Sequence, residues 1–391
     1  MKEAERRLGP MSLGVRNVLV VLVVAGVAVF GVTLFQSPTA AWSSLLVAAF
    51  YFLTIALGAI AFLALTYITK AGWSSVVKRV PEAMSTFLPV GAGLTLTLLL
   101  GIHSLYHWSH PDAVAHDAIL TAKAGYLNAP FFAGRMVVVL GLWLLFGWLF
   151  RRNSLRQDAD AAVHHTRRNV ALAAGYLFLF AFTFSVAGID WLMSLEPHWF
   201  STIFGIYNLA GLLLGGFASI AVVTILLRRA GYLPNVNENH LHDLGKLTFA
   251  MSVFWAYIWI SQYMLIWYSN LPEETTYYLR RTEGGWAFLF YFNVVINWVV
   301  PFVVLLPRPG KRSEANLLRV SLAVLGGRFL DIYLMVAPAN STEHGGVGIV
   351  DVTTFLGVGA LFVLIVYRAL ARRSLIPRGD PYLIEGLHHK Q

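Results

Sequence analysis

Ten long apolar segments dominate this sequence, and they constrain its fold more than any other feature. A helix crosses the hydrocarbon core of a bilayer with about 20 apolar residues. Strands of a membrane barrel would alternate apolar and polar residues in runs of about ten, whereas these segments are continuous. The sequence therefore predicts an all-α integral membrane protein with ten transmembrane helices. We place them at roughly 15–35, 41–69, 81–107, 130–150, 169–195, 200–227, 245–269, 285–306, 316–337 and 350–371.

The composition agrees with a membrane protein and argues against a nucleic-acid-binding protein. The chain is 57% hydrophobic and only 13% charged, whereas a soluble chain carries about 25% charged residues. A net charge of +9 would suggest nucleic acid in a soluble protein. Here the basic residues form short clusters between apolar segments, which is typical of cytoplasmic loops. We therefore expect lipid as a partner and no nucleic acid.

The distribution of the 29 Lys and Arg residues predicts the orientation of the chain. On one side of the predicted helices the loops hold only Lys123, Arg280 and Arg281, and two more, Arg135 and Arg328, fall inside helices. All the others lie on the opposite side. The positive-inside rule then predicts that both termini are cytoplasmic.

The first segment has an alternative interpretation as a signal peptide. Basic residues precede it, and small residues follow it in "SPTAAW". However, the apolar run of residues 18–35 is longer than the usual core of a signal peptide. An uncleaved first helix is the preferred interpretation.

Two helix ends on the outer side are similar to each other. The fifth segment ends "GIDWLMSLEP" and the ninth ends "RFLDIYLMVAP", so Asp190 precedes Pro197 by the same interval as Asp331 precedes Pro338. We interpret helices two to five as repeated in helices six to nine, related by an axis along the membrane normal; chance similarity between apolar helices is the alternative. The predicted organisation is two four-helix bundles, flanked by the first and last helices. The boundaries are 1–40 for the N-terminal tail and first helix, 41–197 and 198–345 for the bundles, and 346–391 for the last helix and cytoplasmic tail.

The absence of cysteine limits the redox chemistry that this chain can carry out. Thiolate-bound iron–sulfur clusters and C-x-x-C-H haem attachment are excluded. His103 and His107 share the end of one predicted helix, and no other predicted helix has an interior histidine, so a haem held by two histidines is not expected. We expect no metal or redox cofactor bound by this chain. His103 is interpreted as an interfacial residue, with proton exchange as the alternative.

Polar residues inside the helices gather in the outer half of the predicted bilayer. A charged residue at this depth costs at least about 2.5–3.5 kcal/mol, so each needs a partner or a wet cavity. Asp190 and Asp331 each lie about 10 Å from their outer proline. The candidate site residues, for a proton path or for contact with quinone, are Asp190, Asp331, Arg328, Arg135, Gln262, Tyr263, His103 and Asn293.

Two ion pairs are expected among these residues. Arg135 and Asp190 lie at similar depth on neighbouring helices, and Arg328 and Asp331 are spaced i, i+3 on one helix. Structural ion pairs and a proton relay are both consistent with this pattern. Gln262 shares a helix face with tryptophans, where a structural hydrogen bond between helices is favoured over contact with quinone or with a proton path. Interior prolines are few, so broken helices near the midplane, which are typical of transporters, are not expected.

Three stretches resemble a known family. They are "NHLHDLGKLTFAMSVFWAYIWISQYMLIWYSNLPEET" at 239–275, "DWLMSLEPHWFSTIFGIY" at 190–207 and "GRFLDIYLMVAP" at 327–338. They resemble the second large, quinone-binding-type membrane subunit of alternative complex III, which is similar in turn to the membrane subunits of polysulfide-reductase-type enzymes. The resemblance covers nearly the whole chain and implies the same ten-helix, two-bundle fold.

The resemblance also implies a function and partners. Alternative complex III oxidises quinol, with menaquinol the expected substrate, and passes electrons to a cytochrome c, a copper protein or a terminal oxidase in a bacterial inner membrane. The implied partners are a multihaem cytochrome c with haem c, an iron–sulfur subunit with its clusters, a sister ten-helix subunit and small membrane subunits. In the family the sister subunit is the better candidate for the quinol site, which leaves proton conduction as the alternative role here.

Carried over by motif, five of the candidate residues, Asp190, Gln262, Tyr263, Arg328 and Asp331, are the expected functional positions. An Arg328 that neutralises Asp331 would weaken a proton role for that aspartate. Two other functions remain open at this point, a secondary transporter and a structural assembly subunit.

Overall fold

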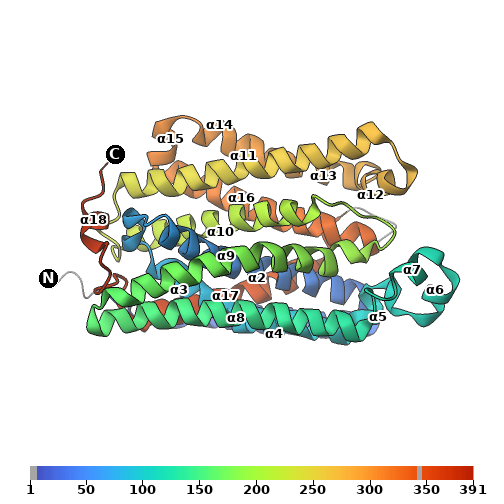
Figure 1. Ribbon diagram of the computed structural model, residues 1–391, viewed down its shortest axis with the longest axis horizontal. Coiled ribbons are helices and arrows are strands. Elements are labelled where there is room, and N and C mark those ends of the chain that lie inside the picture. The colour runs from blue at the N-terminus through green and yellow to red at the C-terminus, as the bar shows by residue number, and fades with distance from the viewer. Residues whose placement is uncertain (1–6, 341–345, 391) are drawn as a thin grey trace.

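The computed structural model describes residues 7–340 and 346–390, and all regular secondary structure in these residues is helical (Figure 1). Within these described residues, ten stretches are long and apolar enough to cross a bilayer, which confirms the predicted number of spans. They are α1 (Leu13–Gln36), α2 (Pro38–Ile68), Arg79–Leu105, α8 (Ala129–Asp160), Val163–Leu195, α10 (Phe204–Arg229), α11 (Glu238–Ser269), Trp286–Leu305, α16 (Glu314–Asn340) and α17 (Ile349–Ala371). The boundary predicted at residue 345 lies outside the described residues.

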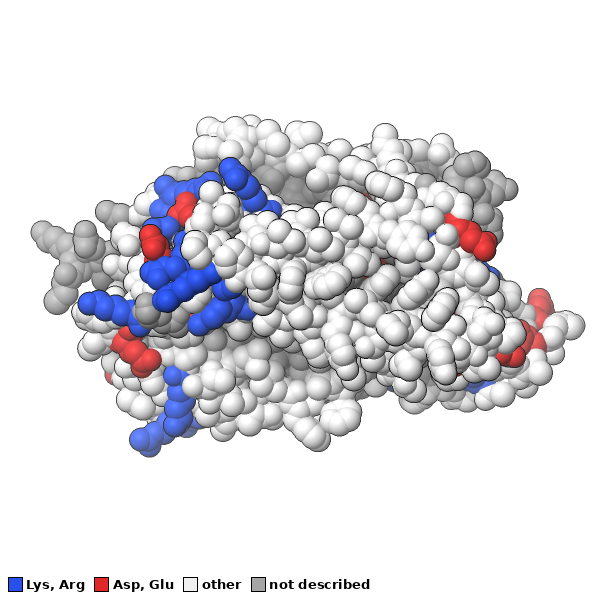
Figure 2. Space-filling model, turned by 90° about the horizontal axis from the view of Figure 1, so that it is seen from above, with Lys and Arg blue, Asp and Glu red and all other residues white. Residues whose placement is uncertain are grey.

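Short helices lie at the two ends of the long ones (Figure 1). One end carries α6 (Pro111–His116), α7 (Ala118–Lys123) and α12 (Pro272–Thr282), and we call it the loop end. The other end carries α15 (Arg308–Arg312), α18 (Leu383–Leu387) and the first and last residues that the structure describes, and we call it the basic end. Figure 2 shows that Lys and Arg side chains gather there, as the charge pattern of the sequence requires.

Helix α2 forms the centre of the molecule and is buried along nearly its whole length. It packs against α10, and glycines allow the two backbones to touch. A Cβ atom built on Gly58 would lie 2.8 Å from the Cα atom of Gly216, so a larger residue at this crossing would force the two backbones apart. Helix α1 packs mainly on α17, and both pack on α2.

The remaining contacts form two rings of helices. In one ring α2, α4 (Leu88–Thr97), α8 and α9 (Val163–Trp191) pack in turn around a common core. In the other, α10 packs with α11 and α16, and the Trp286–Leu305 stretch packs against α11 and α16. The rings meet where α2 and α9 contact α10, and where α2 contacts α16. Residues distant in sequence are thereby brought to the same depth.

Within the described residues, three of the spanning stretches are not continuous α-helices, contrary to the expectation of unbroken helices. The Val163–Leu195 stretch ends in a 3₁₀ turn at Met193–Leu195. The Arg79–Leu105 stretch contains 3₁₀ turns at Ser85–Phe87 and Leu98–Gly101. The Trp286–Leu305 stretch contains a π-helical turn at Val295–Val299. Pro301 follows this turn and has no N–H to donate to the carbonyl four residues earlier, that of Asn297. The hydroxyl of Ser252 on α11 donates to that carbonyl instead, at 2.6 Å. One proline is therefore enough to alter this helix.

Candidate functional site

Asp331 is the centre of a buried polar cluster formed by four helices. Arg328, one turn earlier on α16, forms an ion pair with it, as the i, i+3 spacing predicts. Tyr207 of α10 donates its hydroxyl to Oδ1, and Asn293 of α13 (Trp286–Val294) donates Nδ2 to the same oxygen at 2.8 Å. Trp255 of α11 donates its indole N–H to Oδ2 at 3.2 Å. Only donors surround this carboxylate, which is the arrangement suited to an anion.

Glycines on α10 make room for the arginine of this cluster. A Cβ atom on Gly211 would lie 2.2 Å from Nη2 of Arg328, and one on Gly215 would lie 3.4 Å from its Cγ. The guanidinium therefore lies flat against a bare stretch of helix. Because Arg328 is only 2% exposed, its charge is balanced inside the protein by Asp331.

A small cavity of about 20 Å³ adjoins Asp331 and has room for about one water molecule. Gln262 of α11 contributes to its wall and is only 3% exposed. The Oε1 atom of this glutamine is buried and has no hydrogen-bond partner among the described residues. A buried acceptor without a donor is costly, and a water molecule in the cavity would satisfy it. Tyr277, Tyr278 and Arg281 of α12 also line the cavity.

Arg281 closes the cavity toward the loop end. Its Nε donates to the carbonyl of Leu334 at 2.8 Å, and its Nη2 pairs with Glu196 at 2.7 Å. The Leu334 carbonyl is available because Pro338, four residues later and inside α16, has no N–H to donate. Sequence reasoning counted Arg281 only as a loop charge. The proline inside α16 is the sequence feature that could have predicted the partner of Arg281, the carbonyl of Leu334.

Both loops at the loop end contact the turn between α9 and α10. Glu196 pairs with Arg281, and Trp199 stacks on Tyr277 with ring centroids 3.9 Å apart. From the other loop, Asp117 bonds His198 at 2.5 Å. Burial raises the pKa of Tyr277 to about 12, so its phenol is neutral under this turn. These contacts favour a rigid arrangement of the α9–α10 turn and the two loops over the cavity.

Asp117 has a second role at the start of α7. It accepts hydrogen bonds from the backbone N–H groups of Leu120 and Ile119, which cap this helix. The bond from Leu120, followed by the contact with His198, holds the pKa of Asp117 below its usual value. The carboxylate therefore stays charged at neutral pH and orders the loop.

The second predicted ion pair lies in the other ring of helices. Arg135 of α8 binds Asp190 of α9 with two nitrogens, at 2.7 and 3.1 Å. The guanidinium stacks on the ring of Tyr126, 3.8 Å from its centroid, and donates to the carbonyl of the same residue. As for Asp331, the aspartate is 1% exposed and balanced by an arginine.

The candidate residues are only partly brought together. Gln262 and Asn293 join Asp331 at the cavity, and Arg328 pairs with Asp331 without lining the cavity. Tyr263 is half-buried and stacks on Trp259, with ring centroids 5.6 Å apart, beside the cavity rather than in its wall. His103 lies in α5 (Ile102–Leu105), is exposed and bonds Ser109 at 3.0 Å, so it is not part of this cluster. The 3₁₀ turn just before His103 alters the helical register assumed for it.

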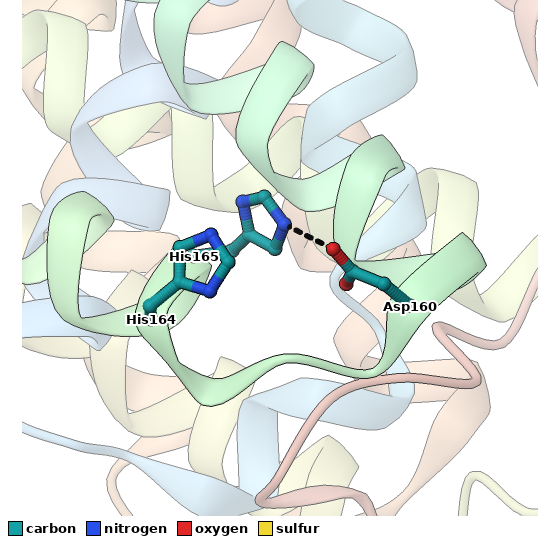
Figure 3. Close-up of side chains that lie close together, drawn as sticks. All are labelled: Asp160, His164 and His165. Carbon is teal, nitrogen blue, oxygen red and sulfur yellow. Dashed lines mark hydrogen bonds and ion pairs between the residues drawn. The ribbon is translucent and has the colours of Figure 1, made fainter.

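A separate group of potential metal ligands lies at the basic end (Figure 3). The ligand atoms of Asp160, His164 and His165 lie within 4.8 Å of one another, although no metal site was expected there. His165 bonds Asp160 at 2.8 Å, and Asp160 also accepts the backbone N–H of Ala162 at 2.9 Å. The carboxylate is thus already used to order the turn between α8 and α9. This arrangement explains the cluster without an ion.

Comparisons with known proteins identify no relative. Neither a search of protein-family models nor a search of curated proteins returned a match. The resemblance to alternative complex III therefore remains a prediction from the sequence stretches quoted above.

Proposed function

We propose that this chain is a membrane subunit of a quinol-oxidising complex of the alternative complex III type, and that its Asp331 cluster takes part in proton transfer. The chain itself would hold no redox centre. Haem c and iron–sulfur clusters would reside in partner subunits, and menaquinol would be oxidised in the sister ten-helix subunit. The expected location is a bacterial inner membrane, with both termini cytoplasmic. The three family-like stretches support this assignment, and Asp331, Gln262 and Tyr207 lie within them.

We also propose that the two rings of helices are repeated four-helix bundles. Each ring contains one buried Arg–Asp pair, Arg135 with Asp190 and Arg328 with Asp331. The two aspartates occupy equivalent positions in the sequence repeat, on α9 and α16. The pairing partner differs, since one arginine is on a neighbouring helix and the other is on the same helix.

The proposed role of the Asp331 cluster in proton transfer rests on one observation. The unpartnered Oε1 of Gln262 lines a cavity of about 20 Å³ that is also lined by Asp331. A cavity with a volume near that of one water molecule can hold a water that carries a proton. It is far too small for a quinone ring. Proton transfer is therefore favoured over quinol binding at this site.

The roles of the residues follow from their contacts. Asp331 supplies a fixed negative charge, and Arg328 balances it as long as the two remain paired. Gln262 would hold a water molecule beside the carboxylate. A proton would bind Asp331 only after Arg328 separates from it, because the neighbouring cation favours the anion. A change in the side-chain conformation of Arg328, which moves its guanidinium away from Asp331 during turnover, would therefore control proton uptake.

The test uses the purified assembly in vesicles, with quinol oxidation and proton movement measured together. Asp331→Asn should abolish the coupled proton movement and leave quinol oxidation within a factor of about two. Asp190→Asn is the matched control, since it removes an equally buried, arginine-paired carboxylate that does not line this cavity. Unchanged proton movement in an assembled Asp331→Asn complex would refute the proposal. Purification without c-type haem subunits would refute the family assignment.

A secondary transporter is the second candidate. It is favoured by the π-helical turn at Val295–Val299, which directly follows the α13 helix that carries Asn293. Irregular helices at a polar site are typical of transporters. Uptake of a solute by vesicles containing this chain alone would support that function. A purely structural subunit would instead leave turnover and proton movement intact in both aspartate variants.

A further inference from the structure

A groove at the basic end combines arginine side chains with an apolar wall. It lies between the Arg79–Leu105 stretch and α8, and its volume is about 550 Å³. Leu88, Leu144 and Trp148 line its apolar part. The polar part is lined by four arginines, three from the end of α8 and one that follows α17: Arg151, Arg152, Arg156 and Arg373.

The arginines of this groove lack acidic partners. The neighbouring acidic residues, Glu82 and Asp158, both pair with the buried Arg79. Within residues 7–340 and 346–390, no carboxylate forms an ion pair with any of the four groove arginines, although several other basic residues are paired. Arg152 stacks on Trp148, with its guanidinium 4.6 Å from a ring centroid. Glu82 attracts Arg151, but Arg79, Arg372 and Arg373 repel it, and an anion bound in the groove would relieve that repulsion.

The position of the groove indicates the chemistry of this anion. The end of a spanning helix lies at the depth of lipid headgroups, and the apolar wall extends from it along α8 toward the bilayer core. Guanidinium groups bind phosphate through paired hydrogen bonds, and basic pockets between transmembrane helices recognise anionic headgroups. An inorganic anion would leave Leu88, Leu144 and Trp148 without a partner.

We propose that this groove binds an anionic phospholipid. Its phosphate would contact the four arginines, and one acyl chain would lie along the apolar wall. Arg152 and Arg156 are exposed, so the headgroup can reach them from the surrounding membrane. The inference does not depend on quinol oxidation, because it uses neither Asp331 nor the cavity beside it.

The test compares lipid binding to the purified protein by native mass spectrometry, with phosphatidylglycerol and phosphatidylcholine added in turn. The double variant Arg152→Gln/Arg156→Gln should bind phosphatidylglycerol about tenfold or more weakly, since each basic residue near the membrane surface contributes substantially to anionic lipid binding. The matched control is Arg167→Gln/Arg168→Gln on α9, which removes two exposed arginines from the same end but outside the groove. This control should bind as the unaltered protein does.

Three outcomes would overturn the proposal. Equal losses in the two double variants would indicate attraction to the basic end as a whole. Equal binding of phosphatidylcholine would remove the role of charge. Full displacement of phosphatidylglycerol by inorganic phosphate would indicate a simple anion site in which the apolar wall has no part.

Discussion

Replacement of Arg281 by methionine tests how the loop end is held over the candidate site. Arg281 is 1% exposed, although it lies on α12, outside the spanning stretches. Its guanidinium binds Glu196, the carbonyl of Leu334 and the carbonyl of Tyr277, and it stacks on the Tyr277 ring 3.4 Å from the centroid. Methionine keeps an unbranched apolar stem and removes all of these polar contacts.

The expected cost follows from the groups left behind. Removal of one partner from a buried ion pair costs about 3–5 kcal/mol. Glu196 retains Arg280, at 3.4 Å, so the lower part of this range applies. The Leu334 carbonyl also loses its donor, which adds about 1–3 kcal/mol if no water replaces it. Arg281→Met should therefore lower the free energy of unfolding by about 3–6 kcal/mol.

Arg280→Met is the matched control, because Arg280 lies on the same helix and contacts the same glutamate but is 56% exposed. Its replacement should cost about 1 kcal/mol or less. Unfolding is followed by helical circular dichroism in mixed micelles with increasing dodecyl sulfate. Equal costs for the two arginines would refute the reasoning.

A second-site change tests the role of the proline. Pro338→Ala restores an N–H that can donate to the Leu334 carbonyl. In the Arg281→Met background it should recover about 1 kcal/mol. A double-mutant cycle measures this coupling, and strict additivity of the two changes would show that Arg281 does not serve the carbonyl left free by Pro338.

Three further predictions concern other parts of the fold. Gly216→Ala places a Cβ 2.7 Å from the Cα of Gly58 and should cost about 1–3 kcal/mol in the same unfolding assay; no loss would mean that α2 and α10 separate easily. Ser252→Ala removes the donor to the Asn297 carbonyl and should cost about 1–2 kcal/mol, with an unchanged midpoint as the contrary result. Burial raises the pKa of Tyr277 to about 12, whereas the pKa of a tyrosine in the unfolded chain is about 10. The stability that the neutral phenol provides is therefore lost as the pH rises from about 10 through about 12. Tyr277→Phe should therefore lose less stability than the unaltered protein between about pH 9 and about pH 11, and parallel losses would contradict this.

Local spacing was sufficient to predict some of the candidate site. Arg328 and Asp331 pair because residues three apart face the same side of a helix, whatever surrounds them. Arg135 and Asp190 pair because buried charges at matching depth have few other partners in an apolar region. In both cases the cost of an isolated charge in lipid determines the outcome.

Other parts of the site depend on contacts that no spacing reveals. Tyr207 and Trp255 bind Asp331 from two different helices, and Arg281 reaches α16 from a loop helix. The rotation of each apolar helix about its axis is set by packing against its neighbours. Pro301 and Pro338 were visible in the sequence, but their effect was underestimated, because each of the two frees a carbonyl for a side chain of another helix.

The sequence by itself determined that the chain forms ten apolar helices, because lipid requires every backbone polar group to be paired within a span. It also determined that the basic residues gather at one end, because they lie in the loops on one side of these helices. Only the tertiary structure decided which helix faces meet. It brought Gln262 to the cavity beside Asp331 and left the arginines of the groove without acidic partners. The physical reason is that an apolar helix in a bilayer packs about as favourably against lipid as against any other apolar helix. Small residues and a few polar contacts then select one packing.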